Sequence, residues 1–284
     1  PFIKQINDLK QENENKGENK LSKEELQIEI DKVLDEQEKY RQEHNMQLEE
    51  DGLTEQEIAD HHNALANKLF AFGFSLFNYR SMSKPWFPIA MDNENNGSND
   101  SHGRSGKSLL FTKCIEAVIN TFDTIPAGEI DDKSDDQFLF DGVRKQTTAI
   151  SFDDANAFFP YRNQLFSFVT GNPKINRKHK GKITIPFEKR PIPLVTSNHG
   201  MPKLGSSFDA RVIYVPFADY YHAERKELTM RELKVVNDLG MELFTDFTDD
   251  QWVQFYNTVA HCIQFAMNQE DKVHPPMGNV EKRN

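Results

Sequence analysis

Cysteine is nearly absent from this chain. Only Cys114 and Cys262 occur among its 284 residues, and they lie far apart, without the spacing of a zinc or redox motif. Two isolated cysteines exclude a disulfide framework and favour an intracellular, cytoplasmic protein that is not secreted. The chain begins at Pro1, has its first methionine at Met46 and shows no signal-type segment. We therefore expect it to be a fragment of a longer polypeptide.

Long apolar runs are also absent. The longest apolar stretch, residues 65–79, is interrupted by Asn67, Lys68 and Asn78. A helix that crosses a bilayer needs about 20 consecutive apolar residues, so we expect no membrane segment. With 37% hydrophobic and 28% charged residues, the chain has the composition of a globular protein rather than a disordered one.

An overall excess of basic residues is missing too, because the net charge is -11. The acidic excess is concentrated in residues 1–60, which hold 8 Lys and Arg against 18 Asp and Glu. Residues 61–284 hold 26 Lys and Arg against 27 Asp and Glu, so they are close to neutral. The net charge therefore does not exclude a nucleic-acid partner for this larger part of the chain.

Helix-start signals occur near both ends of the sequence. Three capping boxes precede amphipathic stretches: Ser22 with Glu25, Thr54 with Glu57, and Thr248 with Gln251. They predict an acidic helical subdomain over residues 1–80 and a C-terminal helical segment over residues 247–284.

The intervening residues 81–246 have a different pattern, in which short apolar runs alternate with helical or polar stretches. This alternation is typical of an α/β fold with a central parallel sheet flanked by helices. The expected strands cover residues 87–91, 148–152, 192–197 and 211–217.

A glycine-rich polar segment, residues 101–108, ends in the Gly-Lys-Ser of a Walker A phosphate loop. Gly106 would let the backbone approach phosphates, Lys107 would reach the terminal phosphates, and Ser108 would bind Mg²⁺. Ser101 stands where the pattern usually has its first glycine, and a polar insert precedes it. The tripeptide alone is equally compatible with an ordinary loop before a helix. The candidate nucleotide-binding residues are Gly103, Arg104, Ser105, Gly106, Lys107 and Ser108.

Two adjacent carboxylates, Asp153 and Asp154, follow the apolar run at residues 148–152 in the manner of a Walker B motif. At the carboxyl end of a strand, Asp153 could hold Mg²⁺ together with Ser108, and Asp154 could orient the attacking water. A helix cap or a turn would explain the same pair without catalysis.

Two further residues complete a candidate catalytic set. Asn198 follows the strand expected at residues 192–197, where it could bind the attacking water or the terminal phosphate, although asparagine is also an ordinary turn residue. Arg211 begins the strand expected at residues 211–217, where it could reach the phosphate in a neighbouring subunit. A surface salt bridge is the alternative role for Arg211.

A basic segment lies between the Walker B pair and Asn198. Residues 174–190 contain 7 Lys and Arg but only one acid, and Gly181 with alternating isoleucines predicts a hairpin over residues 172–186. Lys178, His179 and Lys180 would lie near its tip as DNA-binding residues. A solvated basic loop is the alternative.

Residues 86–217 carry these motifs in an order that resembles superfamily 3 helicases, which are AAA+ P-loop ATPases of phages, viruses and mobile elements. In that family the loop ending at Ser108, the pair Asp153–Asp154 and Asn198 correspond to Walker A, Walker B and motif C. Arg211 corresponds to the trans-acting arginine, and Lys178-His179 to the pair at the tip of a DNA-contacting hairpin.

The resemblance implies a homo-oligomeric, hexameric ring that binds ATP and Mg²⁺ between subunits and moves along single-stranded DNA. It also implies a fused or associated primase, and it suggests a ring-forming collar for residues 1–80.

Two other functions stay open. A P-loop ATPase that acts on protein or in DNA packaging would hydrolyse ATP without responding to single-stranded DNA. A non-hydrolysing, DNA-binding scaffold fragment would bind nucleotide without turnover.

Overall fold

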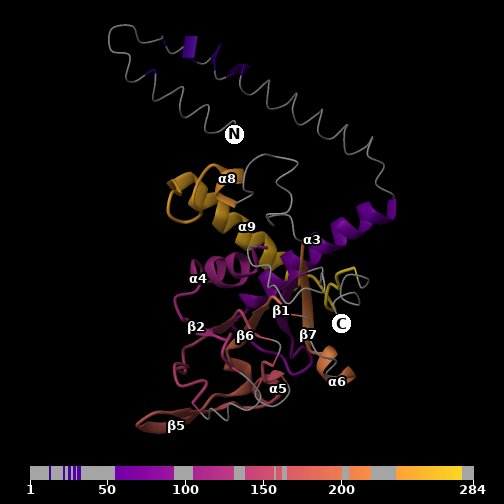
Figure 1. The fold of residues 1–284 in the computed structure, drawn as a ribbon, viewed down its shortest axis with the longest axis vertical. Coiled ribbons are helices and arrows are strands. Elements are labelled where there is room, and N and C mark those ends of the chain that lie inside the picture. The colour runs from indigo at the N-terminus through magenta and orange to yellow at the C-terminus, as the bar shows by residue number, and fades with distance from the viewer. Residues whose placement is uncertain are drawn as a thin grey trace.

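The computed structural model describes residues 13, 22, 25, 26, 28, 29, 31, 32, 55–92, 105–130, 138–156, 158–161, 165–199, 205–218 and 235–276. Within these residues the centre of the molecule is a parallel sheet with the strand order β2-β3-β6-β1-β7 (Figure 1). Its strands are β1 (Phe87–Asp92), β2 (Phe122–Pro126), β3 (Ala149–Asp153), β6 (Ile192–Ser197) and β7 (Val212–Phe217). The α/β architecture and the four strands predicted from the sequence are confirmed, with shifts of one residue at their ends.

The sequence did not predict β2. This strand lies at the edge of the sheet and pairs with β3, from Phe122 beside Ala149 to Pro126 beside Asp153. It is short, none of its residues is fully buried, and it ends in a proline, which is tolerated on an edge strand but argues against a central one. Because of these features, the sequence pattern of β2 resembles that of a turn.

The central strands β1 and β6 are buried at every position, as expected for a parallel sheet covered on both faces. The phosphate-loop segment continues into η2 (Leu109–Lys113), a wide helical turn, and α4 (Cys114–Glu116). Phe111 and Ile115 of this segment are buried in the core. The remaining short helices are α5 (Phe166–Thr170), η4 (Phe187–Lys189), α6 (Ser206–Asp209) and α8 (Val235–Leu239).

Two long helices, α3 (Glu55–Ser75) and α9 (Asp249–Met267), pack against each other. They approach closely at Gly73, where a Cβ atom would lie 2.0 Å from the carbonyl oxygen of Cys262. The side chain of Asn67 donates a hydrogen bond to the carbonyl oxygen of Val273, 2.7 Å away. Because α3 also packs on β1 and β7, it belongs to the same core as the sheet.

Two of the three capping boxes form as the sequence predicted. The backbone N–H of Gln251 donates to the Thr248 hydroxyl while the Gln251 side chain accepts from the Thr248 N–H. Ser22 and Glu25 exchange the equivalent contacts. Thr54 lies outside the described residues. The division into segments 1–80, 81–246 and 247–284 stays a prediction.

The basic segment forms the predicted hairpin from the antiparallel strands β4 (Lys174–Arg177) and β5 (Lys180–Thr184). Lys178 and His179 make its two-residue turn, and His179 has a positive φ of 55°. The Ile185 N–H donates to the Pro173 carbonyl oxygen at 3.0 Å and closes the base of the hairpin. In Figure 1 the hairpin extends from the end of the molecule opposite α8 and α9.

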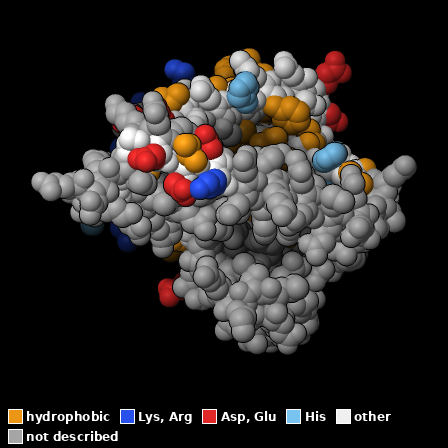
Figure 2. Space-filling model, turned by 90° about the horizontal axis from the view of Figure 1, so that it is seen from above, with side chains coloured by type: hydrophobic (Ala, Val, Ile, Leu, Met, Phe, Trp, Pro, Cys, Tyr) orange, Lys and Arg blue, Asp and Glu red, His pale blue; other side chains and the backbone are white. Residues whose placement is uncertain are grey.

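Seen from above, the described residues show hydrophobic side chains gathered together, with acidic, basic and histidine side chains among and around them (Figure 2). The exposed hydrophobic residues of α8 and α9 are Val236, Leu239, Val253, Tyr256 and Met267. Among the described residues, no helix is both long enough and apolar enough to span a bilayer.

Candidate functional site

The sheet order places the predicted motifs on neighbouring strands. β3, β6 and β1 lie side by side and parallel, so the segments that leave their carboxyl ends meet at one edge of the sheet. The Walker B pair ends β3, Asn198 follows β6, and the phosphate loop follows β1. In an open α/β sheet, ligands bind outside the carboxyl ends of the strands. This edge, called here the carboxyl edge, is the candidate nucleotide site.

The described part of the phosphate loop turns sharply at Gly106. Its φ of 93° lies in a region that side chains other than glycine rarely adopt. The carbonyl oxygen of Gly106 accepts the first helical hydrogen bond, from the Leu110 N–H at 3.0 Å. The candidate residues Gly103 and Arg104 lie outside the described residues, together with Ser101.

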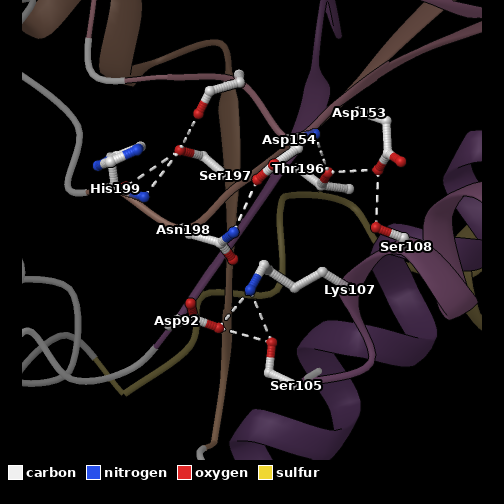
Figure 3. Close-up of polar contacts among 11 residues, drawn as sticks. Asp92, Ser105, Lys107, Ser108, Asp153, Asp154, Thr196, Ser197, Asn198 and His199 are labelled. Carbon is white, nitrogen blue, oxygen red and sulfur yellow. Dashed lines mark hydrogen bonds and ion pairs between the residues drawn. The ribbon is translucent and has the colours of Figure 1, made fainter. Parts of the chain in front are cut away.

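Lys107 makes a buried polar cluster with Ser105 and Asp92 (Figure 3). Its ammonium forms an ion pair with the Asp92 carboxylate and donates to the Ser105 hydroxyl at 2.7 Å. The Ser105 hydroxyl donates to the same carboxylate at 2.6 Å. Only 6% of Lys107, 6% of Asp92 and 7% of Ser105 is exposed.

Asp92 was not predicted as a site residue. The sequence shows it at the start of the polar stretch that separates the strand from the loop. In the structure it is the last residue of β1, with its side chain buried at the carboxyl edge. A signal existed in the sequence, because a carboxylate directly after an apolar strand was the feature that identified Asp153.

Ser108 and Asp153, the two residues predicted to hold Mg²⁺, lie in contact. The Ser108 hydroxyl donates to the Asp153 Oδ1 at 2.7 Å, and the Thr196 hydroxyl donates to the same oxygen at 2.8 Å. A serine hydroxyl and one carboxylate are hard oxygen donors of the kind that Mg²⁺ uses together with substrate phosphates. The pair therefore fits the predicted metal site. Thr196, which reaches Asp153 from β6, was missed because a threonine inside an apolar strand carries no motif.

Asp154 and Asn198 also lie together. The Asn198 amide donates to the Asp154 Oδ1 at 2.7 Å, and the Asp154 N–H donates to the Thr196 hydroxyl at 2.9 Å. Asp154 has a positive φ of 57°, a conformation that aspartate and asparagine adopt more readily than most residues. This turn exposes the Asp154 side chain at the end of β3, while the Asp153 side chain is half-buried.

Buried hydroxyls tie this edge together beneath the motifs. The hydroxyls of Thr112 and Ser151 lie 2.9 Å apart and join the helical segment after the loop to β3. The Ser197 hydroxyl donates to the Ala155 carbonyl oxygen at 2.6 Å and accepts from the His199 N–H at 3.0 Å. The segments that carry Asp154 and Asn198 are therefore held in a fixed relation.

Arg211 lies at the opposite, amino edge of the sheet. It directly precedes β7, and its carbonyl oxygen accepts from the Phe87 N–H at the start of β1. Six strand residues at about 3.3 Å each separate the two edges by roughly 20 Å. Its guanidinium lies 5.0 Å from the Phe166 ring and donates to the Ser207 hydroxyl at 3.1 Å. The role predicted for Arg211 therefore requires a second subunit.

Two more arginines are buried at the amino edge. Arg80 donates to the carbonyl oxygens of Phe77 and Thr148, the latter at 3.2 Å. The Arg190 guanidinium lies 5.0 Å from the Phe187 ring. It donates a long hydrogen bond, 3.4 Å, to the Pro191 carbonyl oxygen. Burial lowers the pKa of Arg80 to about 9, with a smaller contribution from the charge of Arg190, and it lowers the pKa of Arg190 to about 10.

The hairpin tip presents the predicted DNA-binding residues to solvent. Lys178, His179 and Lys180 are all exposed. The tip rests on a turn before β3, because the Lys178 N–H donates to the Asp141 carboxylate at 2.9 Å and its ammonium lies 5.9 Å from the Phe138 ring. The basic groups are therefore available to a phosphate backbone, and their DNA contact stays a prediction.

Comparison with solved structures gave 25 matching chains, and two of them are structures of the NrS-1 C-terminal region. One apo structure has a TM-score of 0.43 and 14% sequence identity, and covers 79% of this chain and 51% of that chain. The other has a TM-score of 0.42 and 13% identity, with 79% and 50% covered. The chain thus spans about half the length of these structures. No family model and no curated protein matches it.

Proposed function

We propose that this chain is the motor of an ATP-dependent DNA helicase of the superfamily 3 type, an oligomeric ring that moves along single-stranded DNA during replication. One observation carries the proposal. Ser108 meets Asp153, and Asn198 meets Asp154, on adjacent parallel strands beside a lysine-bearing phosphate loop. Three motifs separated in the sequence, the phosphate loop, the Asp153–Asp154 pair and Asn198, converge on one edge, as a nucleotide site requires.

The nucleotide phosphates would lie against the loop at Gly106 and the helical segment that follows it. Backbone N–H groups at the start of a helix point toward an anion, and the helix dipole favours its negative charge. Lys107 would add a mobile positive charge near the terminal phosphates. Ser108 and Asp153 would hold Mg²⁺, which when bound neutralises charge on the phosphates.

Hydrolysis needs a water aligned with the terminal phosphate. Asp154 is exposed at the end of β3 and would accept a hydrogen bond from that water and orient it. The Asn198 amide already donates to the Asp154 carboxylate, so it would restrict the direction of this carboxylate. The positioning of the water would come from residues of this chain alone.

The opposite edge supports a ring. Arg211 is too far from the Walker residues of its own chain to stabilise charge on the same nucleotide. In a head-to-tail ring the amino edge of one subunit can face the carboxyl edge of the next, because such heterologous contacts close by rotation. An arginine supplied in this way stabilises the developing charge of phosphoryl transfer.

The hairpin supplies the candidate DNA contact. It concentrates positive charge on an exposed tip in a chain whose net charge is -11. Single-stranded DNA would be held mainly through its phosphates, in a salt-dependent manner.

The test is the rate of Mg-ATP hydrolysis with and without single-stranded DNA, for the parent and for Lys178→Ala/His179→Ala. We expect DNA to stimulate the parent several-fold and not to stimulate the variant, whose DNA-free rate is unchanged. The matched control is Lys145→Ala/His261→Ala, which removes the same residue types from exposed positions outside the hairpin.

The other outcomes identify the alternatives. If single-stranded DNA does not change the rate of ATP hydrolysis by the parent, an ATPase that acts on protein or in DNA packaging is favoured. Nucleotide binding without hydrolysis, even at chain concentrations that give oligomers, would favour a scaffold fragment.

A further inference from the structure

Lys107 is the least accessible member of the candidate nucleotide site. Ser108 and Asp154 are exposed, and Asp153 is half-buried, whereas only 6% of Lys107 is exposed. Its ammonium is directed to Asp92 at the end of β1 (Figure 3). In this arrangement the lysine that should meet phosphate already has an anionic partner.

The Asp92 carboxylate receives the donors that a phosphate oxygen would otherwise receive. Its Oδ1 accepts hydrogen bonds from both the Lys107 ammonium and the Ser105 hydroxyl. A buried ion pair with further hydrogen bonds is costly to break on one side only, because the remaining charge stays desolvated. The Ser105 hydroxyl would still donate to Asp92 after Lys107 leaves, so the carboxylate would keep one partner.

We propose that Asp92 is a positioning residue that holds Lys107 away from the phosphate site in the nucleotide-free chain, and that nucleotide binds by taking Lys107 from it. The Asp92–Lys107 pair is called the latch below. The latch lowers nucleotide affinity in two ways. The lysine must give up a desolvated carboxylate, and the carboxylate then faces the incoming phosphates as a like charge. Such a latch favours release of nucleotide after each turnover.

The first measurement does not depend on the proposed function. The nucleotide-free chain is treated briefly with an amine-acetylating reagent, and acetylation of Lys107 is read by peptide mass spectrometry. Lys107 should react slowly in the parent and about tenfold faster in Asp92→Asn, because the neutral amide holds an ammonium less strongly.

Lys272 serves as an internal standard for folding. It donates to three backbone carbonyl oxygens of Asp209, Ala210 and Val212 at 3.0–3.1 Å, far from the latch. Faster acetylation of Lys107 with unchanged acetylation of Lys272 reports local release, whereas faster reaction at both reports unfolding. In that event Asp92→Ser is measured in the same way.

The second measurement rests on the proposed function. We expect Asp92→Asn to bind a fluorescent ATP analogue with Mg²⁺ about tenfold more tightly than the parent, since a hydrogen bond to a charged group is worth about that much. Asparagine has nearly the same shape and can still accept from Ser105. The matched control is Glu116→Gln. It neutralises an exposed carboxylate that lies 3.2 Å from Lys113, on the helical segment that follows Lys107. It should change neither measurement.

The outcomes separate the two proposals. Unchanged acetylation of Lys107 in a folded Asp92→Asn chain overturns the latch, as does nucleotide affinity that is equal or weaker in this variant. If the parent binds no Mg-ATP while Lys107 is released by Asp92→Asn, the latch stands and the proposed function fails.

Discussion

The two edges of the sheet treat charge in opposite ways. At the carboxyl edge the charged groups are paired with groups from neighbouring strands or loops: Lys107 with Asp92, Asp153 with Ser108 and Thr196, and Asp154 with Asn198. At the amino edge three arginines keep buried nitrogen atoms that have no hydrogen-bond partner among the described residues. These atoms are Arg80 Nε, Arg190 Nε and Nη2, and Arg211 Nε.

At the carboxyl edge the polar groups can exchange their partners for a ligand, whereas the amino edge carries excess positive charge. A nucleotide and its metal would replace partners that these polar groups already have, and Asp92 would keep the Ser105 hydroxyl as a donor. The amino edge lies next to the basic hairpin in the chain, since Arg190 directly follows residues 174–189. Positive charge is therefore concentrated in residues 174–190 of a chain that is acidic overall.

The largest expected effect comes from Asp154→Asn at the carboxyl edge. Asparagine tolerates the positive φ at this position and can still accept from Asn198, so the turn should persist. We expect the rate of ATP hydrolysis to fall by about 10²–10³-fold with nucleotide affinity within about twofold. Asp246→Asn, in a turn near α9, is the matched control and should leave the rate unchanged. A fall in affinity equal to the fall in rate would contradict a role in orienting water.

The next effect is on binding. Lys107→Ala should weaken Mg-ATP binding by about 100-fold, because hydrogen bonds to charged groups contribute about 1.5–3 kcal/mol. It also leaves Asp92 buried without its cation, so affinity is measured by titration calorimetry well below the melting temperature of the variant. Lys113→Ala removes an exposed lysine two turns later in the same helical segment and should stay within about twofold. If both variants lost the same affinity for Mg-ATP, the phosphate loop would not be part of the nucleotide site.

The smallest expected effect is on the free energy of unfolding, and it comes from replacing a buried arginine at the amino edge. At pH 7 Arg190 is protonated in the folded and unfolded chain, and its lowered pKa means that the fold disfavours this charge. The cost is fully present below about pH 10 and disappears as pH rises toward the unfolded pKa. Arg190→Met should therefore raise the free energy of unfolding by about 1–2 kcal/mol, or the melting temperature by roughly 2–6 °C.

Arg80→Met is the paired comparison. Arg80 has a similarly lowered pKa, but its guanidinium donates to the carbonyl oxygens of Phe77 and Thr148. Methionine would remove the arginine donor from the Phe77 carbonyl oxygen, at about 1–3 kcal/mol, whereas the Thr148 carbonyl oxygen would still accept from the Ile192 N–H, so the melting temperature should fall. If thermal unfolding shows both variants stabilised or both destabilised, hydrogen bonding does not distinguish the two arginines.

Most of the sheet was predictable because its strands are short apolar runs that end in recognisable polar residues. The hairpin was predictable from alternating isoleucines and the local excess of charge, and its tip at Lys178 and His179 is where the pattern placed it. Strand β2 was not predictable, because an edge strand that ends in Pro126 has the sequence pattern of a turn. Thr196 was missed because it belongs to no motif and its contacts with Asp153 and Asp154 come from the neighbouring strand. Asp92 was missed because its partners, Ser105 and Lys107, lie beyond the polar insert that follows it in the sequence.

By itself, the sequence determined the kind of chemistry available: a Gly-Lys-Ser loop, a carboxylate pair, an asparagine and a basic hairpin, each at the end of a local element whose periodicity is visible in the chain. The tertiary structure alone decided which of these groups meet. The order β3-β6-β1 brings Asp153 to Ser108 and Asn198 to Asp154, and the path of the loop after β1 brings Lys107 back to Asp92. Strand order depends on how crossovers pack and on which apolar faces bury one another, so short-range sequence patterns do not specify it.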